Sequence, residues 1–213
     1  MSNIFDVFKK IENKRDENTA SPVSFLIVAL GNPGREYENT RHNAGFGAID
    51  YIASRAGATI NRAKFNALTS ETVIAGKKVL LMKPQTLMNL SGNAVAPAAK
   101  FYRIPLSSVI VISDDINLDP GRMRFRTKGS DGGQKGLRSI ISCIGSEDFP
   151  RIRIGVGKKP HPDYDLASWV LGVPCQADRE LIQKLYPALF SGVEKIISGD
   201  TEGAMQLCNS FRA

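Results

Sequence analysis

Hydrophobic and polar positions after residue 23 switch repeatedly between strand-like and helix-like spacing. Short apolar runs predict buried or half-buried strands, and a further pair of runs predicts a hairpin that turns at Gly76. The predicted strands span residues 24–30 (SFLIVAL), 107–113 (SSVIVIS), 121–127 (GRMRFRT) and 151–157 (RIRIGVG), and the hairpin spans 66–83. Apolar residues at helical spacing predict helices over residues 44–54, 91–104, 136–145 and 176–198, the second of which contains Pro97.

This alternation is typical of an α/β domain. We expect a single domain with a central twisted mixed β-sheet flanked by helices on both faces. The sheet must be mixed because the hairpin introduces at least one antiparallel pair.

The first 22 residues differ from the rest. Ile4, Phe5, Phe8 and Ile11 recur at helical spacing, and a polar linker that ends at Pro22 follows them. We therefore predict an N-terminal extension over residues 1–22, with a short amphipathic helix and a linker, and an α/β domain over residues 23–213. The helix could dock on its own domain or contact a partner or a membrane.

Composition narrows the class of protein. The 213 residues carry 28 Lys and Arg against 21 Asp and Glu, a net charge of +7 that suits a polyanionic partner without requiring one. The three cysteines form no C-x-x-C or Cys/His cluster, which argues against disulfides and structural zinc. No apolar run is long enough to span a bilayer, and charges near the start do not fit a signal peptide. We expect a cytoplasmic protein, and no membrane contact is expected.

Polar loops rich in Gly or Asn follow several of the predicted strands. They are GNPG (31–34), PQTLMNLSG (84–92), DDINLDPG (114–121) and KGSDGGQKG (128–136). In open α/β sheets, ligands bind beyond the carboxyl ends of the strands because loops from several strands meet there. The four loops are therefore expected to share one cleft.

His42 and Asp114 are candidates for acid–base chemistry in this cleft. His42 stands beside the start of a predicted helix, whose dipole favours a neutral imidazole that accepts a proton. Asp114 is the first charge after a buried strand, where a carboxylate could orient that imidazole. Each residue could instead be structural, as a hydrogen-bonded histidine and a turn-forming aspartate. The other histidine, His161, lies between two prolines in a predicted exposed loop and is not expected to take part.

Two asparagines offer neutral groups that suit a peptide-like amide or carbonyl. Asn32 lies in GNPG and Asn89 in MNLSG. Asn32 could also serve only the turn, and Asn89 could cap the following helix.

Basic residues alternate along one predicted strand. Arg122, Arg124 and Arg126 would share a face, and four more basic residues could extend the patch: Arg151, Arg153, Lys158 and Lys159. Such a layout suits phosphate binding, but charges also protect exposed sheet edges.

No nucleotide-binding or serine hydrolase motif accounts for these residues. KGSDGGQKGLRS lacks the spacing of a phosphate-binding P-loop, and neither G-x-G-x-x-G nor G-x-S-x-G occurs in the expected setting. The glycines would either admit a substrate backbone closely or form a tight entry to the next helix.

Taken together, LIVALGNPGREYENTRHNAG, KPQTLMNLSG, DDINLDPG, GSDGGQKGLRSI and RIRIGVG resemble, in order and spacing, the bacterial peptidyl-tRNA hydrolase family from Ser24 to the C-terminus. The resemblance implies an esterase that needs no metal or other cofactor. It would hydrolyse the bond between a peptide and the 3′ ribose of tRNA, which recycles tRNA from abandoned translation, and would act as a monomer.

The resemblance also implies roles for particular residues. His42 would be the general base that activates water, and Asp114 would orient it. Asn32 and Asn89 would bind the peptide main chain. Tyr37, Leu87 and Met88 would line the site around the tRNA 3′ end, and Arg124, Arg126 and Arg153 would hold a tRNA phosphate.

One segment departs from the family. Where relatives commonly have G-G-His-Asn-G, this chain has GGQKG, so Gln134 and Lys135 replace the usual pair. Lys135 is expected to contact the substrate, either inside the cleft near His42 or at its edge toward solvent and phosphate. An alternative function is a non-catalytic RNA-binding relative, as in organellar splicing factors. The presence of His42, Asp114, Asn32 and Asn89 together favours the enzyme.

Overall fold

Strands and helices alternate along residues 22–213, which are the residues that the computed structural model describes. The strands are β1 (Phe25–Ala29), β2 (Arg62–Lys64), β3 (Ala67–Ile74), β4 (Lys77–Pro84), β5 (Val109–Asp115), β6 (Met123–Arg126) and β7 (Arg151–Gly155). The α-helices are α2 (Ala44–Arg55), α3 (Gly92–Phe101), α4 (Lys135–Ile144), α5 (Leu166–Leu171), α6 (Gln176–Lys184), α7 (Tyr186–Ile197) and α8 (Thr201–Ser210). Short 3₁₀ turns are η1 (Arg35–Tyr37), η2 (Arg41–Asn43), η3 (Met88–Leu90) and η4 (Leu106–Ser108).

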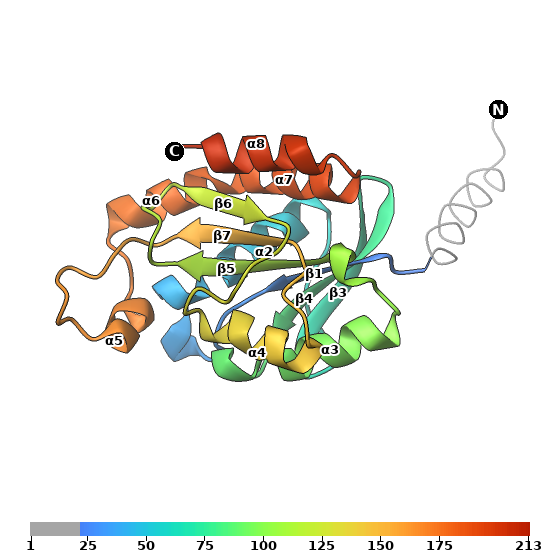
Figure 1. The fold of residues 1–213 in the computed structure, drawn as a ribbon, viewed down its shortest axis with the longest axis horizontal. Helices are drawn as coiled ribbons and strands as arrows, with labels where there is room; N and C mark the ends of the chain where they lie inside the picture. The colour runs from blue at the N-terminus through green and yellow to red at the C-terminus, as the bar shows by residue number, and fades with distance from the viewer. Residues whose placement is uncertain (1–21) are drawn as a thin grey trace, which may run out of the picture.

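The strands form one seven-stranded sheet in the order β2-β3-β4-β1-β5-β7-β6 (Figure 1). The four central strands, β4, β1, β5 and β7, run parallel to one another. Both edges are antiparallel, because β3 and β4 form the predicted hairpin and β6 runs against β7. The fold class is confirmed as a single α/β domain with a mixed sheet.

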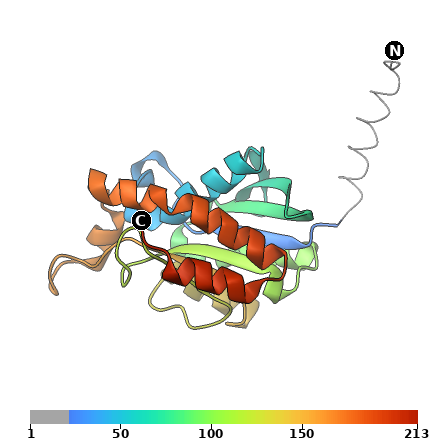
Figure 2. The same ribbon diagram turned by 90° about the horizontal axis from the view of Figure 1, so that it is seen from above.

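Helices cover both faces of the sheet, as predicted. Alternate residues of β1 enter separate apolar clusters, with Ile27 on one side and Leu26 and Val28 on the other. The first cluster includes residues from α2, α7 and α8, and the second includes residues from α3 and α4. Figure 1 shows α7 and α8 along one side of the sheet and α3 and α4 along the other, and Figure 2 shows α7 and α8 lying over the strands.

The prediction of one long helix over residues 176–198 was wrong. The segment forms two helices, α6 and α7, that meet at Leu185. Pro187 explains the break, since its nitrogen carries no hydrogen to donate to the carbonyl of Gln183 one turn earlier. Helix α8 was not predicted either, although Asp200 caps it by accepting a hydrogen bond from the Gly203 N–H at 2.9 Å.

The predicted N-terminal extension lies outside the described residues except for Pro22. Among the helices that the structure does describe, none combines the length and apolar character needed to cross a membrane.

Candidate active site

A cleft of about 560 Å³ opens at one end of the parallel strands. Its walls come from the segments that follow β1, β4, β5, β6 and β7. The lining residues include Asn32, Tyr37, His42, Leu87, Met88, Asn89, Asp114, Gln134, Lys135, Arg153 and Val170. The four loops singled out in the sequence thus converge on one cleft, joined by a fifth segment that includes α5.

The KGSDGGQKG loop reaches this cleft by a different route from the others. β6 is antiparallel to β7, so the carboxyl end of β6 lies at the opposite end of the strands from the cleft. The chain must therefore run back along the length of the strands before α4 begins at Lys135. Gly132 and Gly133 have φ of 57° and 87°, a left-handed conformation that glycine adopts without steric cost. These glycines form a tight entry to α4, which is one of the two roles that the sequence suggested for them.

His42 and Asp114 are 72 residues apart in the chain and in direct contact in the fold. His42 Nδ1 lies 2.9 Å from Asp114 Oδ2, and both side chains are buried except for the edge that lines the cleft. Because an ionised carboxylate only accepts hydrogen bonds, Nδ1 carries the proton in this contact. The other ring nitrogen, Nε2, is then left with a lone pair that can accept a proton.

The packing of α2 brings His42 to this position. Gly45, in the first turn of α2, lies against the backbones of two central strands. A Cβ at Gly45 would be 2.6 Å from the carbonyl oxygen of Leu30 and 2.8 Å from that of Ile112. Glycine therefore allows the start of α2, and η2 before it, to approach the ends of β1 and β5 closely.

Asn32 is held by hydrogen bonds on both its backbone and its side chain. Its Oδ1 accepts from the Met88 N–H at 2.7 Å, and its backbone exchanges two hydrogen bonds with the Asn43 side chain at 2.8 and 2.9 Å. Since a backbone N–H needs an acceptor, the contact with Met88 fixes which end of the Asn32 amide is oxygen. Its Nδ2 is thereby presented to the cleft as a donor.

The other predicted substrate residues also line the cleft. Leu87 and Asn89 are exposed on either side of the buried Met88, Tyr37 ends η1, and Lys135 is the exposed first residue of α4. Asn89 does not cap the next helix, because α3 begins at Gly92 after Ser91.

Gln134 joins the His42 and Asp114 pair, which the sequence analysis did not anticipate. Its Nε2 donates to Asp114 Oδ1 at 3.0 Å, and its Oε1 accepts from the Leu137 N–H at 2.9 Å as the N-cap of α4. The sequence signal was indirect: a polar residue one position before a helix is often a cap, but the pattern does not specify what else it contacts.

The basic residues of β6 and β7 separate into exposed and engaged groups. Arg124 and Arg126 are exposed, and Arg124 lies opposite Arg153 in the strand register. Arg153 contacts the Ser130 carbonyl at 3.1 Å and Asp115 at 3.5 Å, and it lines the cleft. Arg122 is half-buried before β6 begins, and Lys159 donates to carbonyls of its own loop.

Arg151 does not extend the surface patch, contrary to the sequence analysis. Its side chain is fully buried, and its guanidinium donates to the carbonyls of Gly129, Ser130, Glu147 and Phe149. Burial, together with the nearby Arg153 charge, lowers the pKa of Arg151 to about 10. Arg151 ties the loop before α4 to the loop before β7, so its role is structural.

Helix α5 forms a further wall of the cleft and was not predicted. Arg41 secures it: the backbone N–H of Arg41 donates to the Gly172 carbonyl at 3.0 Å, and its guanidinium carbon lies 3.5 Å from the centre of the Trp169 ring. Desolvation lowers the pKa of the buried Arg41 guanidinium. The sequence carries little signal for this helix, because six residues are too few to show a helical period.

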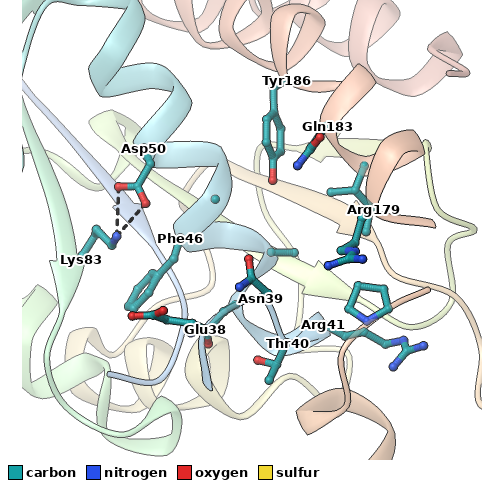
Figure 3. A pocket seen from close by; sticks show the side chains of 15 residues that line it. Glu38, Asn39, Thr40, Arg41, Phe46, Asp50, Lys83, Arg179, Gln183 and Tyr186 are labelled. Atoms are coloured by element: carbon teal, nitrogen blue, oxygen red, sulfur yellow. Dashed lines mark hydrogen bonds and ion pairs between the residues drawn. The ribbon is translucent and has the colours of Figure 1, made fainter. Parts of the chain in front are cut away.

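A second hollow of about 350 Å³ lies between the segment 38–47 and helices α6 and α7 (Figure 3). It shares no lining residue with the cleft. Asp50 and Lys83 pair across 2.9 Å in it, while the Arg41 side chain extends away. Within residues 22–213, no group of three or more His, Cys, Asp or Glu side chains is placed to hold a metal ion.

Comparison with known proteins agrees with this geometry. The sequence profile described as "Peptidyl-tRNA hydrolase" matches residues 26–213. The chain is 48% identical over 189 residues to the peptidyl-tRNA hydrolase of Clostridium novyi, covering 89% of this chain and 100% of that protein. It is 48% identical over 187 residues to the corresponding protein of Carboxydothermus hydrogenoformans, covering 88% and 97% of the two chains.

A solved structure supports the same assignment. The crystal structure of peptidyl-tRNA hydrolase from Acinetobacter baumannii superposes with a TM-score of 0.84 at 35% identity, covering 90% of this chain and 97% of that one. The matched region contains the cleft, the His42 and Asp114 pair and both faces of the sheet. The chain therefore belongs to the peptidyl-tRNA hydrolase family.

Proposed function

We propose that this protein hydrolyses the ester bond that joins a peptide to the 3′ ribose of tRNA. The observation that carries the proposal is the contact of 2.9 Å between His42 Nδ1 and Asp114 Oδ2, which leaves Nε2 available at the cleft. The family assignment supplies the substrate, since the relatives are peptidyl-tRNA hydrolases. The alternative of a non-catalytic RNA-binding protein is not favoured by those relatives.

His42 is the general base in this proposal. Nε2 takes a proton from water as the water oxygen attacks the ester carbonyl carbon. When the tetrahedral intermediate collapses, the bond to the 3′ ribose oxygen breaks, and the imidazolium returns the proton to that oxygen. Asp114 holds the ring in the required tautomer and stabilises its charged form. A positioned base increases the reaction rate by about 10²- to 10⁴-fold. We propose that hydrolysis of the ester needs no metal in addition.

The amide side chains bind the peptide part of the substrate. Asn32 Nδ2 is aimed by the hydrogen bond that Oδ1 accepts from Met88, and it can donate to a substrate carbonyl. Asn89 is exposed at the same wall and offers a second amide. Tyr37, Leu87 and Met88 surround the position of the tRNA 3′ end, and Lys135 is a cation at the edge of the cleft.

Arg124, Arg126 and Arg153 bind tRNA phosphate. Two observations support this role: Arg124 and Arg126 are exposed on the edge strand, and Arg153 lies opposite Arg124 while also lining the cleft. A tRNA contact at this edge would therefore be continuous with the site where the ester lies.

We further propose a cytoplasmic monomer in which residues 1–22 are an extension of the catalytic domain at 23–213. The cysteines Cys143, Cys175 and Cys208 are all free, which fits a reducing compartment. The match covers 100% of the Clostridium novyi protein but 89% of this chain, and the family profile begins at residue 26, which supports an extension before the domain. Light scattering of the purified protein tests the monomer, and deletion of residues 1–22 with retained activity tests the boundary.

Release of peptide from N-acyl-aminoacyl-tRNA tests the proposed function. The wild-type protein should release peptide and intact tRNA, with and without a chelator, and His42→Ala should not. Loss of activity in chelator, restored by an added metal, would contradict the metal-free mechanism. Tight tRNA binding without release would instead support the non-catalytic alternative.

A further inference from the structure

The Gln134 side-chain amide is held at both ends. Oε1 accepts from the Leu137 N–H at 2.9 Å, and Nε2 lies 3.0 Å from Asp114 Oδ1 and 3.2 Å from Met88 Sδ. One end therefore belongs to the N-terminus of α4 and the other to the candidate catalytic pair.

The helix determines which end of the amide faces Asp114. An N-cap contact requires an acceptor, so the oxygen must face the Leu137 N–H. The nitrogen must then face the Asp114 carboxylate, where it donates. The N-cap thus selects the one amide orientation that is favourable for a buried carboxylate.

This contact completes a ring of interactions around the cleft. Asn43, next to His42 in the chain, is bonded to Asn32, and Asn32 is bonded to Met88. Met88 contacts Gln134, Gln134 donates to Asp114, and Asp114 accepts from His42. Four loops are connected in this way, and Gln134 supplies the link between the loop after β4 and the end of β5.

We propose that Gln134 is a positioning residue of the His42 and Asp114 pair. By donating to Oδ1, it holds the Asp114 carboxylate in place and leaves Oδ2 turned toward His42. The role of Gln134 in catalysis rests on the proposed function. The electrostatic effect of residue 134 on His42, through Asp114, does not.

The other charged groups near His42 and Asp114 either have partners of their own or are exposed. Asp115 pairs with Arg153 at 3.5 Å, Asp131 pairs with Arg138 at 3.2 Å, and Asp165 caps α5 by accepting from the Ser168 N–H at 2.7 Å. Arg41 stacks on Trp169, and Lys135 is exposed at the start of α4. Tyr37 is a further titratable side chain that lines the cleft. All of these are common to the wild type and the variants below, so they do not account for a difference between them.

The substitution Gln134→Glu separates positioning from capping. Either carboxyl form can accept from the Leu137 N–H, so the cap is kept. When protonated, the introduced Glu can donate to Asp114 as Gln134 does. When ionised, it places a second negative charge against Asp114 and can no longer donate.

The variant should therefore lose activity as pH rises. Wild-type kcat/KM should increase with pH as His42 loses its proton and then level off. The Gln134→Glu profile should instead be bell-shaped, falling about 10- to 100-fold on the alkaline side as the hydrogen bond to a charged group is lost. A purely structural role would change the height of the profile without adding this alkaline fall.

A direct titration of His42 makes the inference independent of the assay. The chain has two histidines, so the NMR signals of His42 and His161 can be assigned with single substitutions. In Gln134→Glu the introduced carboxyl should lose its proton in a range that overlaps the His42 titration, so the His42 midpoint should move to higher pH, because the partly ionised Glu favours the imidazolium. Gln206→Glu is the matched control, since Gln206 is exposed on α8, and it should leave both the pH profile and the midpoint unchanged.

A second variant covers the case in which Gln134→Glu does not fold. Gln134→Asn retains an amide that can cap α4 but is one methylene too short to reach Asp114 as well. It should lower the plateau of kcat/KM about tenfold without an alkaline fall, and it should also move the His42 midpoint to higher pH, because an Asp114 carboxylate without this donor favours the imidazolium more strongly. Wild-type-like pH profiles and an unchanged His42 midpoint in the Gln134 variants would overturn the inference. If the wild type releases no peptide but the His42 midpoint moves in Gln134→Glu, the proposed function fails and the positioning contact is supported.

Discussion

Two buried polar centres lie on neighbouring strands of this sheet. They differ in whether a hydrogen-bonding atom is left available to a substrate. His42 and Asp114 meet at the end of β5, and Arg151 begins β7. Arg151 directs its guanidinium at four backbone carbonyls, which occupy its donors. The first centre, by contrast, leaves His42 Nε2 free to accept a proton at the cleft.

The comparison shows that burial of an ionisable group does not by itself indicate function. Arg151 is the more deeply buried of the two, and its pKa is lowered to about 10, yet it has no free donor to offer a substrate. The histidine is less buried, but one of its two nitrogens is oriented by a carboxylate while the other faces the cleft. A candidate catalytic group is distinguished here by an atom that neighbouring residues hold in place but do not hydrogen-bond.

The largest expected effect is on turnover at His42. We predict that His42→Ala lowers kcat/KM by about 10²- to 10⁴-fold, since the general base acts in the transition state. Binding of intact tRNA should change little. Asp114→Asn should lower kcat/KM by the same factor or somewhat less. The measurement is steady-state release of peptide beside a binding assay, and wild-type turnover in His42→Ala would falsify the mechanism.

Arg151 should respond in the opposite way, with the main effect on folding. Arg151→Met leaves several buried carbonyls without donors, which we expect to lower the free energy of unfolding by about 2 to 4 kcal/mol. Arg151→Lys should fall between, because an ammonium cannot reproduce the planar fork. Chemical denaturation measures the loss. If Arg151→Met instead keeps wild-type stability and loses activity, the contrast between the two centres is not valid.

Asn32→Asp sharpens the contrast within the cleft. The substituted carboxylate can still accept from the Met88 N–H, but it has no donor to replace Nδ2. We expect kcat/KM to drop about tenfold or more, as for loss of one positioned donor to a developing charge. Unfolding free energy should be close to that of the wild type. An activity equal to that of the wild type would show that Nδ2 makes no contact with the reacting substrate.

The exposed arginines should affect binding rather than chemistry. Arg124→Ala and Arg126→Ala should each weaken the binding of intact tRNA and reduce the slope of log affinity against log salt by about 0.7 to 0.9 per lost phosphate contact. Hydrolysis of a minimal acyl-nucleotide should stay within about twofold. Unchanged salt slopes in both variants would identify these arginines as a protected sheet edge.

Lys135 should have the smallest effect. Lys135→Asn restores the amide usual in the family, and we expect a change in kcat/KM of about two- to fivefold, because an exposed cation contributes little on its own. A cleft-facing ammonium predicts that its removal moves the acidic limb of the kcat/KM profile to higher pH. Superimposed profiles, with weaker binding of intact tRNA, would place Lys135 at the tRNA contact instead.

Much of the fold could be predicted because its signals are local. Buried runs identified β1, β5 and β7, and the rule that loops meet at strand ends brought His42 and Asp114 together across 72 residues. Pro187 was overlooked as a break because the apolar spacing continues through it. Arg151 and Arg153 look equivalent in RIRIG, since the pattern cannot show that two distant loops cover only the first.

Gln134 illustrates the same limit in the candidate site. A polar residue before a helix is often a cap, but the contact of Gln134 with Asp114 depends on how the loop after β6 runs back to the cleft. Tertiary arrangement, rather than residue type, gives the amide its second role.

Gly45 has a consequence for how sequences with this fold can diverge. Any side chain at that position would collide with the carbonyls of Leu30 and Ile112, so the glycine is required for the packing of α2 whether or not the protein is an enzyme. In the proposed mechanism, His42 is needed for the chemistry. A descendant that kept RNA binding and lost hydrolysis would be free to change His42 but would retain Gly45. Among related sequences, we therefore expect the histidine to be retained with the activity and the glycine three positions later to be retained with the fold.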